Sequence, residues 1–229
     1  MGSGVWPGLR TASASRPPHT TAQQGYGTPK PALNLIALYG HTGGIHGVAW
    51  SPDGQRLATA SYDQTVRMWS DAGIELTLFR GHEEAVSDVV WSPDGLHVAT
   101  ASYDRTARVW DAVSGLELAV LPGHEDGVVS MSWSPDGCSI VTSAADGTAR
   151  VWGTQTGAEL AIVGVHGDWI RDVAWSPDGR RIATTSRDRT ARIWNAGIDL
   201  DALVAKARGR VFRVLTEEER RSAMLPELP

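Results

Sequence analysis

The sequence contains side chains of the three types that form a hydrolytic triad, a base, a hydroxyl and a carboxylate, in His41, Ser61 and Asp63. The same types return at matching intervals as His82, Ser102 and Asp104, and again as His166, Ser186 and Asp188. An active site needs one asymmetric constellation, whereas a constellation that recurs at fixed intervals is more often architecture. We therefore interpret these residues as a structural network and predict no catalytic role for them.

The triads belong to a period that runs through most of the chain. Four markers, one His, one Asp and two Trp, recur at intervals of 41, 42 and 42 residues. They are His41, His82, His124 and His166; Trp50, Trp91, Trp133 and Trp175; Asp63, Asp104, Asp146 and Asp188; and Trp69, Trp110, Trp152 and Trp194. Because four independent markers keep one register, the chain contains four copies of one structural unit.

Each copy is predicted to hold short β-strands. Segments 45–50, 86–91, 128–133 and 170–175 are apolar or alternate in polarity, and each ends at Ser-Pro-Asp-Gly. That tetrapeptide suits a tight turn, because Pro presets φ and Gly tolerates a positive φ. Two further β-like segments follow in every copy, and a fourth precedes the next His in the first three. Four strands in about 42 residues are typical of a propeller blade.

The copies resemble the WD-repeat (WD40) β-propeller family over about residues 32–195. The family's Gly-His element is present as Gly40-His41 and at two later sites, and its Trp-Asp pair as Trp110-Asp111. The resemblance implies an all-β protein of four four-stranded blades, of a bacterial type with a C-terminal helical tail. It also implies that in each blade the His bonds the Asp, the Ser bridges, and the third-strand Trp ends the network. The third blade has Ala144 in place of the Ser, so we expect it to open most easily.

Three segments are expected along the chain. Residues 1–31 are rich in Pro, Gly, Ser and Thr and are predicted to be disordered. Residues 32–197 hold the four blades, with 32–39 as the closing strand. Residues 198–229 are predicted to be a helical tail, because apolar residues share one helix face and a capping box follows. The residues behind this prediction are Leu200, Leu203, Val204 and Ala207 on the face, and Thr216 and Glu219 in the box.

Four blades are few for a propeller of this family. Residues 32–39 are predicted to form a strand with no blade before it, while the last blade lacks a β-like fourth strand in its sequence. Three arrangements follow: a four-bladed ring within one chain, a homodimer that completes an eight-bladed ring, and an open fragment of a longer protein. We favour completion of the ring by self-association.

The composition argues against several function classes. A net charge of −5 is unlike a nucleic-acid-binding domain, and the single Cys138 permits no intrachain disulfide. His82-Glu83 and His124-Glu125 begin like zinc-protease motifs, but no second His follows at the required position. We therefore predict no enzyme activity, metal site or cofactor. The sequence shows no membrane-length apolar stretch and no signal peptide, so a cytoplasmic location and no membrane contact are expected.

The loops beside the His and Asp residues are the predicted binding surface, because loops carry recognition on a rigid scaffold. The candidate residues for binding a protein or peptide are Tyr62, Tyr103, Trp169, Arg171 and Arg187. Trp169 could instead pack on a neighbouring blade or under the tail. The predicted function is a non-catalytic protein–protein interaction scaffold. One alternative is the sensor portion of a bacterial NTPase- or kinase-linked signalling protein, and a less favoured one is a scaffold for RNA or ribosome assembly.

Overall fold

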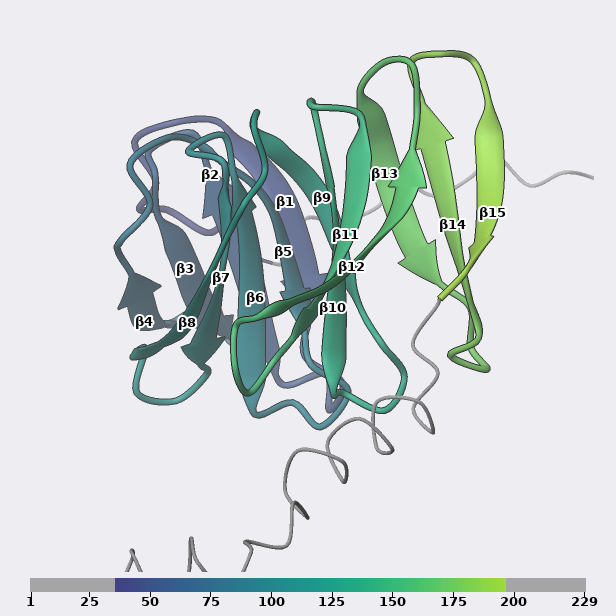
Figure 1. Cartoon of the computed structure of the whole chain (residues 1–229). Coiled ribbons are helices and arrows are strands. Elements are labelled where there is room, and N and C mark those ends of the chain that lie inside the picture. Colours follow the sequence, from purple (N-terminus) through teal and green to yellow (C-terminus); the bar gives the residue numbers. More distant parts are fainter. Residues whose placement is uncertain (1–35, 197–229) are drawn as a thin grey trace, which may run out of the picture. The chain divides into compact units, whose positions relative to one another are not determined.

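The computed structural model describes residues 36–196, which form four antiparallel sheets in chain order (Figure 1). The first sheet consists of β1 (Ile45–Trp50), β2 (Arg56–Ser61), β3 (Val66–Ser70) and β4 (Glu75–Phe79). The second consists of β5 (Val86–Trp91), β6 (His97–Ser102), β7 (Thr106–Asp111) and β8 (Glu117–Pro122). The third consists of β9 (Val128–Trp133), β10 (Ser139–Ala144), β11 (Thr148–Gly153) and β12 (Glu159–Val165). The last has three strands within the described residues, β13 (Ile170–Trp175), β14 (Arg181–Ser186) and β15 (Ala191–Asn195).

The prediction of four all-β blades is confirmed for this part of the chain. The predictions of a disordered segment 1–31 and a helical tail 198–229 lie outside the described residues. The described residues contain no helix long and apolar enough to cross a membrane.

The Ser-Pro-Asp-Gly sequences form the turns between the first and second strands of the sheets. In the first turn the Ser51 hydroxyl donates to Asp53 over 2.5 Å, and the backbone N–H of Arg56 donates to the Ser51 hydroxyl over 2.9 Å. Gly54 has a φ of 71°, in the left-handed region that favours glycine. The glycines of the other three turns have φ values between 69° and 72°. The repeated tetrapeptide is thus explained by local turn geometry alone.

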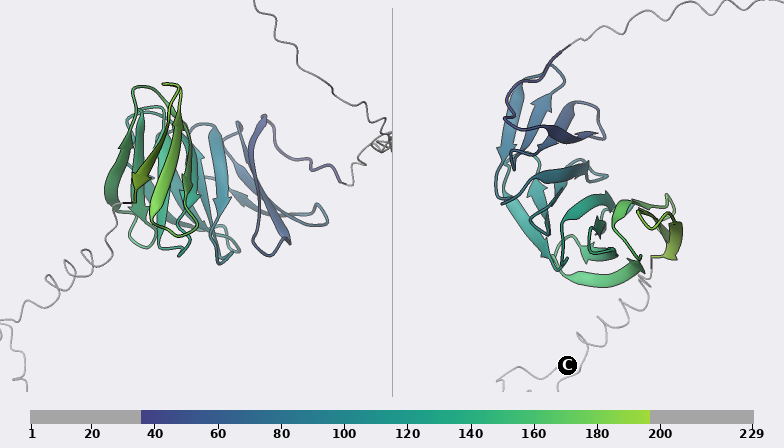
Figure 2. Two further views of the ribbon diagram at one scale, coloured as in Figure 1. Left: turned by 90° about the vertical axis from the view of Figure 1, so that its right-hand side faces the viewer. Right: turned by 90° about the horizontal axis from the view of Figure 1, so that it is seen from above.

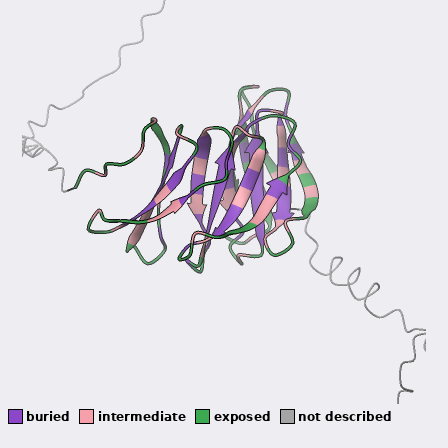
Figure 3. Ribbon diagram, turned by 90° about the vertical axis from the view of Figure 1, so that its left-hand side faces the viewer, coloured by how far each residue is buried: buried purple, intermediate pink, exposed green. Residues whose placement is uncertain are grey.

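Apolar residues fill the space between neighbouring sheets. β1 lies against β5, β5 against β9 and β9 against β13, so the sheets stand side by side (Figure 2). At each interface a third-strand residue of one sheet shares an apolar cluster with a first-strand residue of the next: Met68 with Val89, Val109 with Met131, and Val151 with Val173. Buried residues concentrate on the strands, while the connecting loops are mostly exposed (Figure 3). The second and third sheets therefore bury one face against the sheet before them and the other against the sheet after them, while the first and last sheets have one such neighbour each among the described residues.

The described part of the predicted closing strand, residues 36–39, is not assigned to a strand. The Ile36 and Leu38 side chains lie beside Gly73, in the turn between β3 and β4. Residues 32–35 lie outside the described residues, so the closing role of 32–39 stays a prediction.

A carboxylate lies in the interface between the second and third sheets. Asp88 on β5 accepts hydrogen bonds from the backbone N–H of Met131 and from the Ser130 hydroxyl, both over 3.1 Å. Burial raises the pKa of Asp88 to about 6, against the lowering effect of these hydrogen bonds, and the nearby Asp172 carboxylate adds to the rise. The folded protein therefore retains the Asp88 proton over a range in which the unfolded chain has lost it.

Because the pKa of Asp88 is raised on folding, its contribution to stability falls as the pH rises from about 4 to about 6. We expect Asp88→Asn to raise the free energy of unfolding by about 1–2 kcal/mol above pH 6, because Asn carries no charge and keeps an acceptor oxygen. Below pH 4 the gain should vanish. Urea unfolding of both proteins at pH 4 and pH 8 measures the difference, and an equal effect at the two pH values would contradict the prediction.

Candidate functional site

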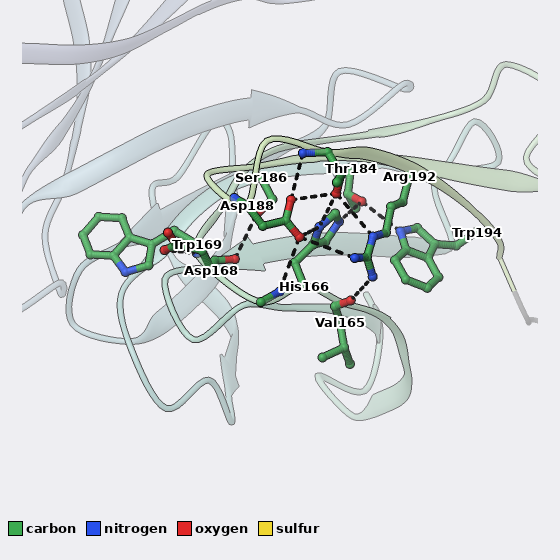
Figure 4. Close-up of polar contacts among 11 residues, drawn as sticks. Val165, His166, Asp168, Trp169, Thr184, Ser186, Asp188, Arg192 and Trp194 are labelled. Carbon is green, nitrogen blue, oxygen red and sulfur yellow. Dashed lines mark hydrogen bonds and ion pairs between the residues drawn. The ribbon is translucent and has the colours of Figure 1, made fainter.

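A hydrogen-bond network lies at one end of each sheet, and Figure 4 shows that of the last sheet. His166 Nδ1 is 2.8 Å from Asp188 and His166 Nε2 is 2.8 Å from the Thr184 hydroxyl. Trp194 Nε1 donates to the same hydroxyl over 2.8 Å. Because an ionised carboxylate can only accept, His166 Nδ1 donates to Asp188, while Nε2 is bonded to the Thr184 hydroxyl. The order of the network is therefore Asp, His, Thr and Trp.

The bridging hydroxyl belongs to threonine in all four sheets, so the expectation of a serine bridge is wrong. The residues that bond both the His and the Trp are Thr59, Thr100, Thr142 and Thr184. Ser102 instead accepts from the backbone N–H of Asp104 over 3.1 Å and donates to the Ala85 carbonyl over 3.0 Å. The serine therefore braces the loop around the carboxylate, because it bonds backbone groups on both sides of it.

The third sheet shows what the loss of this serine removes. Ala144 has no hydroxyl, yet His124 Nδ1 still lies 2.9 Å from Asp146, and Thr142 still bonds His124 Nε2 and Trp152 Nε1, each over 2.8 Å. The network itself is complete, and only the loop brace is missing. Easier opening of this sheet stays a prediction, with its cause moved from the network to the loop.

The carboxylates of the network are held in the charged form. Burial acts to raise the pKa of Asp104, but hydrogen bonds from His82 and Thr106 outweigh it and hold that pKa well below its usual range. Asp63, Asp146 and Asp188 are lowered in the same way, with a threonine hydroxyl and a histidine among the donors in each case. A strongly ionised Asp keeps its His oriented, since it accepts the Nδ1 proton. These four carboxylates stabilise the fold above about pH 4, and that stability is lost as the pH falls further.

The threonine bridge can be tested in the second sheet. Thr100→Val should lower the free energy of unfolding by about 1–3 kcal/mol, because it removes a partner from both the buried His82 and the buried Trp110 Nε1. Ser102→Ala should cost less, since Ala144 is accommodated at the same position. Chemical denaturation measures both, with Thr42→Val in an exposed loop as the control. A larger loss for Ser102→Ala than for Thr100→Val would contradict the assigned bridge.

The residues proposed for partner binding lie at the same end of the sheets as the network. The residue before each network Asp donates its backbone N–H to the loop that enters the first strand: Tyr62 to Gly44, Tyr103 to Ala85, Ala145 to Gly127, and Arg187 to Trp169. These bonds join the end of each second strand to the start of each first strand, which meet at one edge of an antiparallel sheet. We call this edge of the four sheets the loop face. Arg171 follows Trp169 by two residues and is also exposed.

Trp169 and Arg187 are in contact on the loop face. The Arg187 guanidinium lies 4.1 Å from the centre of the Trp169 ring, a cation–π arrangement. Trp169 projects away from the His166 network in Figure 4 and is half-buried. The Tyr103 ring of the second sheet lies against Gly127 of the third sheet. At the equivalent positions of the third and fourth sheets the small residue comes first, as Ala145, and the large one second, as Trp169.

Two polar residues near the starts of the first strands bond the neighbouring sheet. His46 Nδ1 lies 3.2 Å from the Ser87 carbonyl, and the Ser87 hydroxyl donates to the Val128 carbonyl over 2.7 Å. Both residues thus link one sheet to the next.

Acidic side chains lie in the exposed His loops of the loop face: Glu83, Glu84, Glu125, Asp126 and Asp168. Within residues 36–196 no three potential ligands gather into a metal site.

Antiparallel blades packed face to face, with the same polar network in each, define a protein of the β-propeller class. The family model "WD domain, G-beta repeat" matches residues 33–70, 73–111, 115–153 and 157–195, which together are about two thirds of the sequence. The chain belongs to the WD-repeat family.

One curated relative is the "Probable cytosolic iron-sulfur protein assembly protein 1" of Mycosarcoma maydis. The two sequences are 51% identical over 53 residues, which are 22% of this chain and 12% of the relative. The chain is thus similar to a small part of that protein, about the length of one or two repeats.

Proposed function

We propose that the chain is a non-catalytic interaction scaffold that holds a protein or peptide partner on its loop face. The observation that carries the proposal is the contact of the exposed Arg187 guanidinium with the half-buried Trp169 ring, next to the exposed Arg171. Tyr62 adds a second aromatic anchor, 51% exposed and held edge-on against His46. Trp, Tyr and Arg within a polar rim are the composition of a binding hot spot.

The four network carboxylates do not favour catalysis. Each donates nothing, is held in the charged form and has its acceptor oxygens occupied by hydrogen bonds from threonine, histidine and the backbone. A hydrolytic site requires a histidine next to a free nucleophile. Here both ring nitrogens of each histidine are bonded within the network. The relative is named as a cytosolic iron-sulfur protein assembly protein, which supports a cytoplasmic scaffold as the proposal for this chain.

The binding affinity of a partner should depend on side chains of the loop face. We expect Tyr62→Ala, and the double variant Trp169→Ala with Arg187→Ala, each to weaken binding of a captured partner at least about 10-fold, since hot-spot truncation costs more than about 1.4 kcal/mol. Partners are captured from the native host with the unaltered chain, and the affinity of each purified partner is then measured by calorimetry.

Leu96→Ala is the matched control, because Leu96 is 57% exposed in a turn at the opposite end of the sheets. The control should bind as the unaltered chain does, and all variants should keep its melting temperature. Equal affinity of the loop-face variants and the unaltered chain for every captured protein would refute the proposed surface.

A further inference from the structure

The first and last sheets each expose a face that the inner sheets bury. On β1, Val48 is 65% exposed and Trp50 is 56% exposed, whereas the equivalent Val89 and Trp91 are 1% and 8% exposed. We call the apolar surface of Ile45, Val48 and Trp50 the leading face. On the last sheet, Ile193 is 71% exposed, whereas the equivalent Val109 is 2% exposed. We call the surface of Ala183, Ala191 and Ile193 the trailing face.

These two faces are the two halves of one interface that the chain builds three times. Between consecutive sheets, a trailing face always packs on a leading face, as in the clusters of Met68 with Val89 and of Val109 with Met131. The exposed leading and trailing faces therefore have the shape and the residue types to fit each other. In the structure they do not cover each other, since both are exposed.

The backbone at the two faces is complementary as well. Ile36 and Leu38 lie beside Gly73 in the same way as Thr77 and Phe79 of β4 lie beside Gly115 in the second sheet. Residues 36–38 thus occupy the place of an outer strand that belongs to a preceding sheet. At the other end, β15 has no outer strand among the described residues, and its free edge is the matching position.

Polar side chains of the two exposed faces also correspond to a pair that is in contact between the inner sheets. At the first interface, Arg56 donates to the Gly95 carbonyl over 2.9 Å and its guanidinium lies 4.7 Å from the centre of the Trp91 ring. The equivalent of Arg56 in the last sheet is the exposed Arg181, and the equivalent of Trp91 in the first sheet is the exposed Trp50. Arg181 and Trp50 are therefore an arginine and an aromatic ring in position for the same contact.

The geometry points to a second copy of this chain as the occupant of both faces. The trailing face of one copy docks on the leading face of the other, and β15 pairs with residues 36–38 of the partner. The register of β3 with β4 carries over to this seam, which places Ala191 opposite Leu38, Arg192 opposite Ala37 and Ile193 opposite Ile36. Twofold symmetry then forms the same seam twice, so that no leading or trailing face stays exposed. The residues proposed for partner binding, Tyr62, Tyr103, Trp169, Arg171 and Arg187, belong to neither the leading nor the trailing face, so the inference is independent of the proposed function.

Light scattering on the full chain tests the seam through the particle mass. We expect twice the mass of one chain, and a reduction to one chain for Val48→Asp and for Ile193→Asp, since each places a charge in an apolar interface. Val113→Asp is the matched control, because Val113 is 74% exposed in the turn between β7 and β8, and it should keep the doubled mass. Mixing Val48→Asp with Ile193→Asp should restore association, because one of the two seams is then free of substitutions.

A disulfide across the seam separates pairing between chains from closure within one chain. In a Cys138→Ser background, Leu38→Cys and Ala191→Cys are made as separate variants and mixed under mild oxidation. A cross-linked species of two chains, formed by the mixture and by neither variant with Val113→Cys, is the expected result. Single-chain mass for the unaltered protein at every concentration, or a disulfide that forms only within a Leu38→Cys and Ala191→Cys double variant, would overturn the proposal.

Discussion

The constraint on which the structure depends is that a blade has two apolar faces and cannot bury either one alone. A sheet of four short strands covers one face of its neighbour and needs a further neighbour for its own second face. The clusters that join Met68 to Val89 and Val109 to Met131 show this dependence directly, because each contains residues of two sheets. Stability in this fold is therefore a property of pairs of sheets, and a single repeat has no core of its own.

The polar network solves a second problem, which is how to fix the loops at one end of each sheet. A Trp, a His and a Thr would each leave a buried polar atom without a partner, and their mutual bonds remove that cost. The Asp then ties the loop before the first strand to the turn after the second, because Asp104 accepts both the His82 ring proton and the backbone N–H of Thr106. The residues proposed for recognition, such as Tyr62, are carried on loops that this network ties to the sheet. The network and the proposed binding surface are thus adjacent.

The sequence was sufficient to predict the repeats, the strands and the turns, because each of these depends on local residue types. The period of the His and Trp markers predicted four sheets, and the Ser-Pro-Asp-Gly tetrapeptides predicted four turns. The threonine bridge was missed although Thr59, Thr100, Thr142 and Thr184 recur at the same intervals as the other markers. Threonine is common in β-strands, so its presence there carries no signal of a polar role.

Features that arise between sheets could not be predicted from the sequence. Asp88 occupies a first-strand position where the other repeats have Gly47, Ser130 and Asp172, and nothing in the sequence shows that it is the one with a strongly raised pKa. Within the last sheet, the positions of Trp169 and Arg187 are neighbours in every repeat, but the sequence does not show that these two side chains touch. Such contacts depend on which side chain stands next to which in three dimensions.

The sequence repeat and the sheet are out of step by one strand, since the match to residues 73–111 begins before β4, the outer strand of the first sheet. A recombination event at a repeat boundary therefore cuts through a sheet and never between two sheets. One product then ends in a sheet that lacks its outer strand, and the other begins with an outer strand that lacks its sheet. Two such ends together make one complete sheet. Genes for this fold can gain or lose whole repeats while every junction in the protein remains a complete sheet.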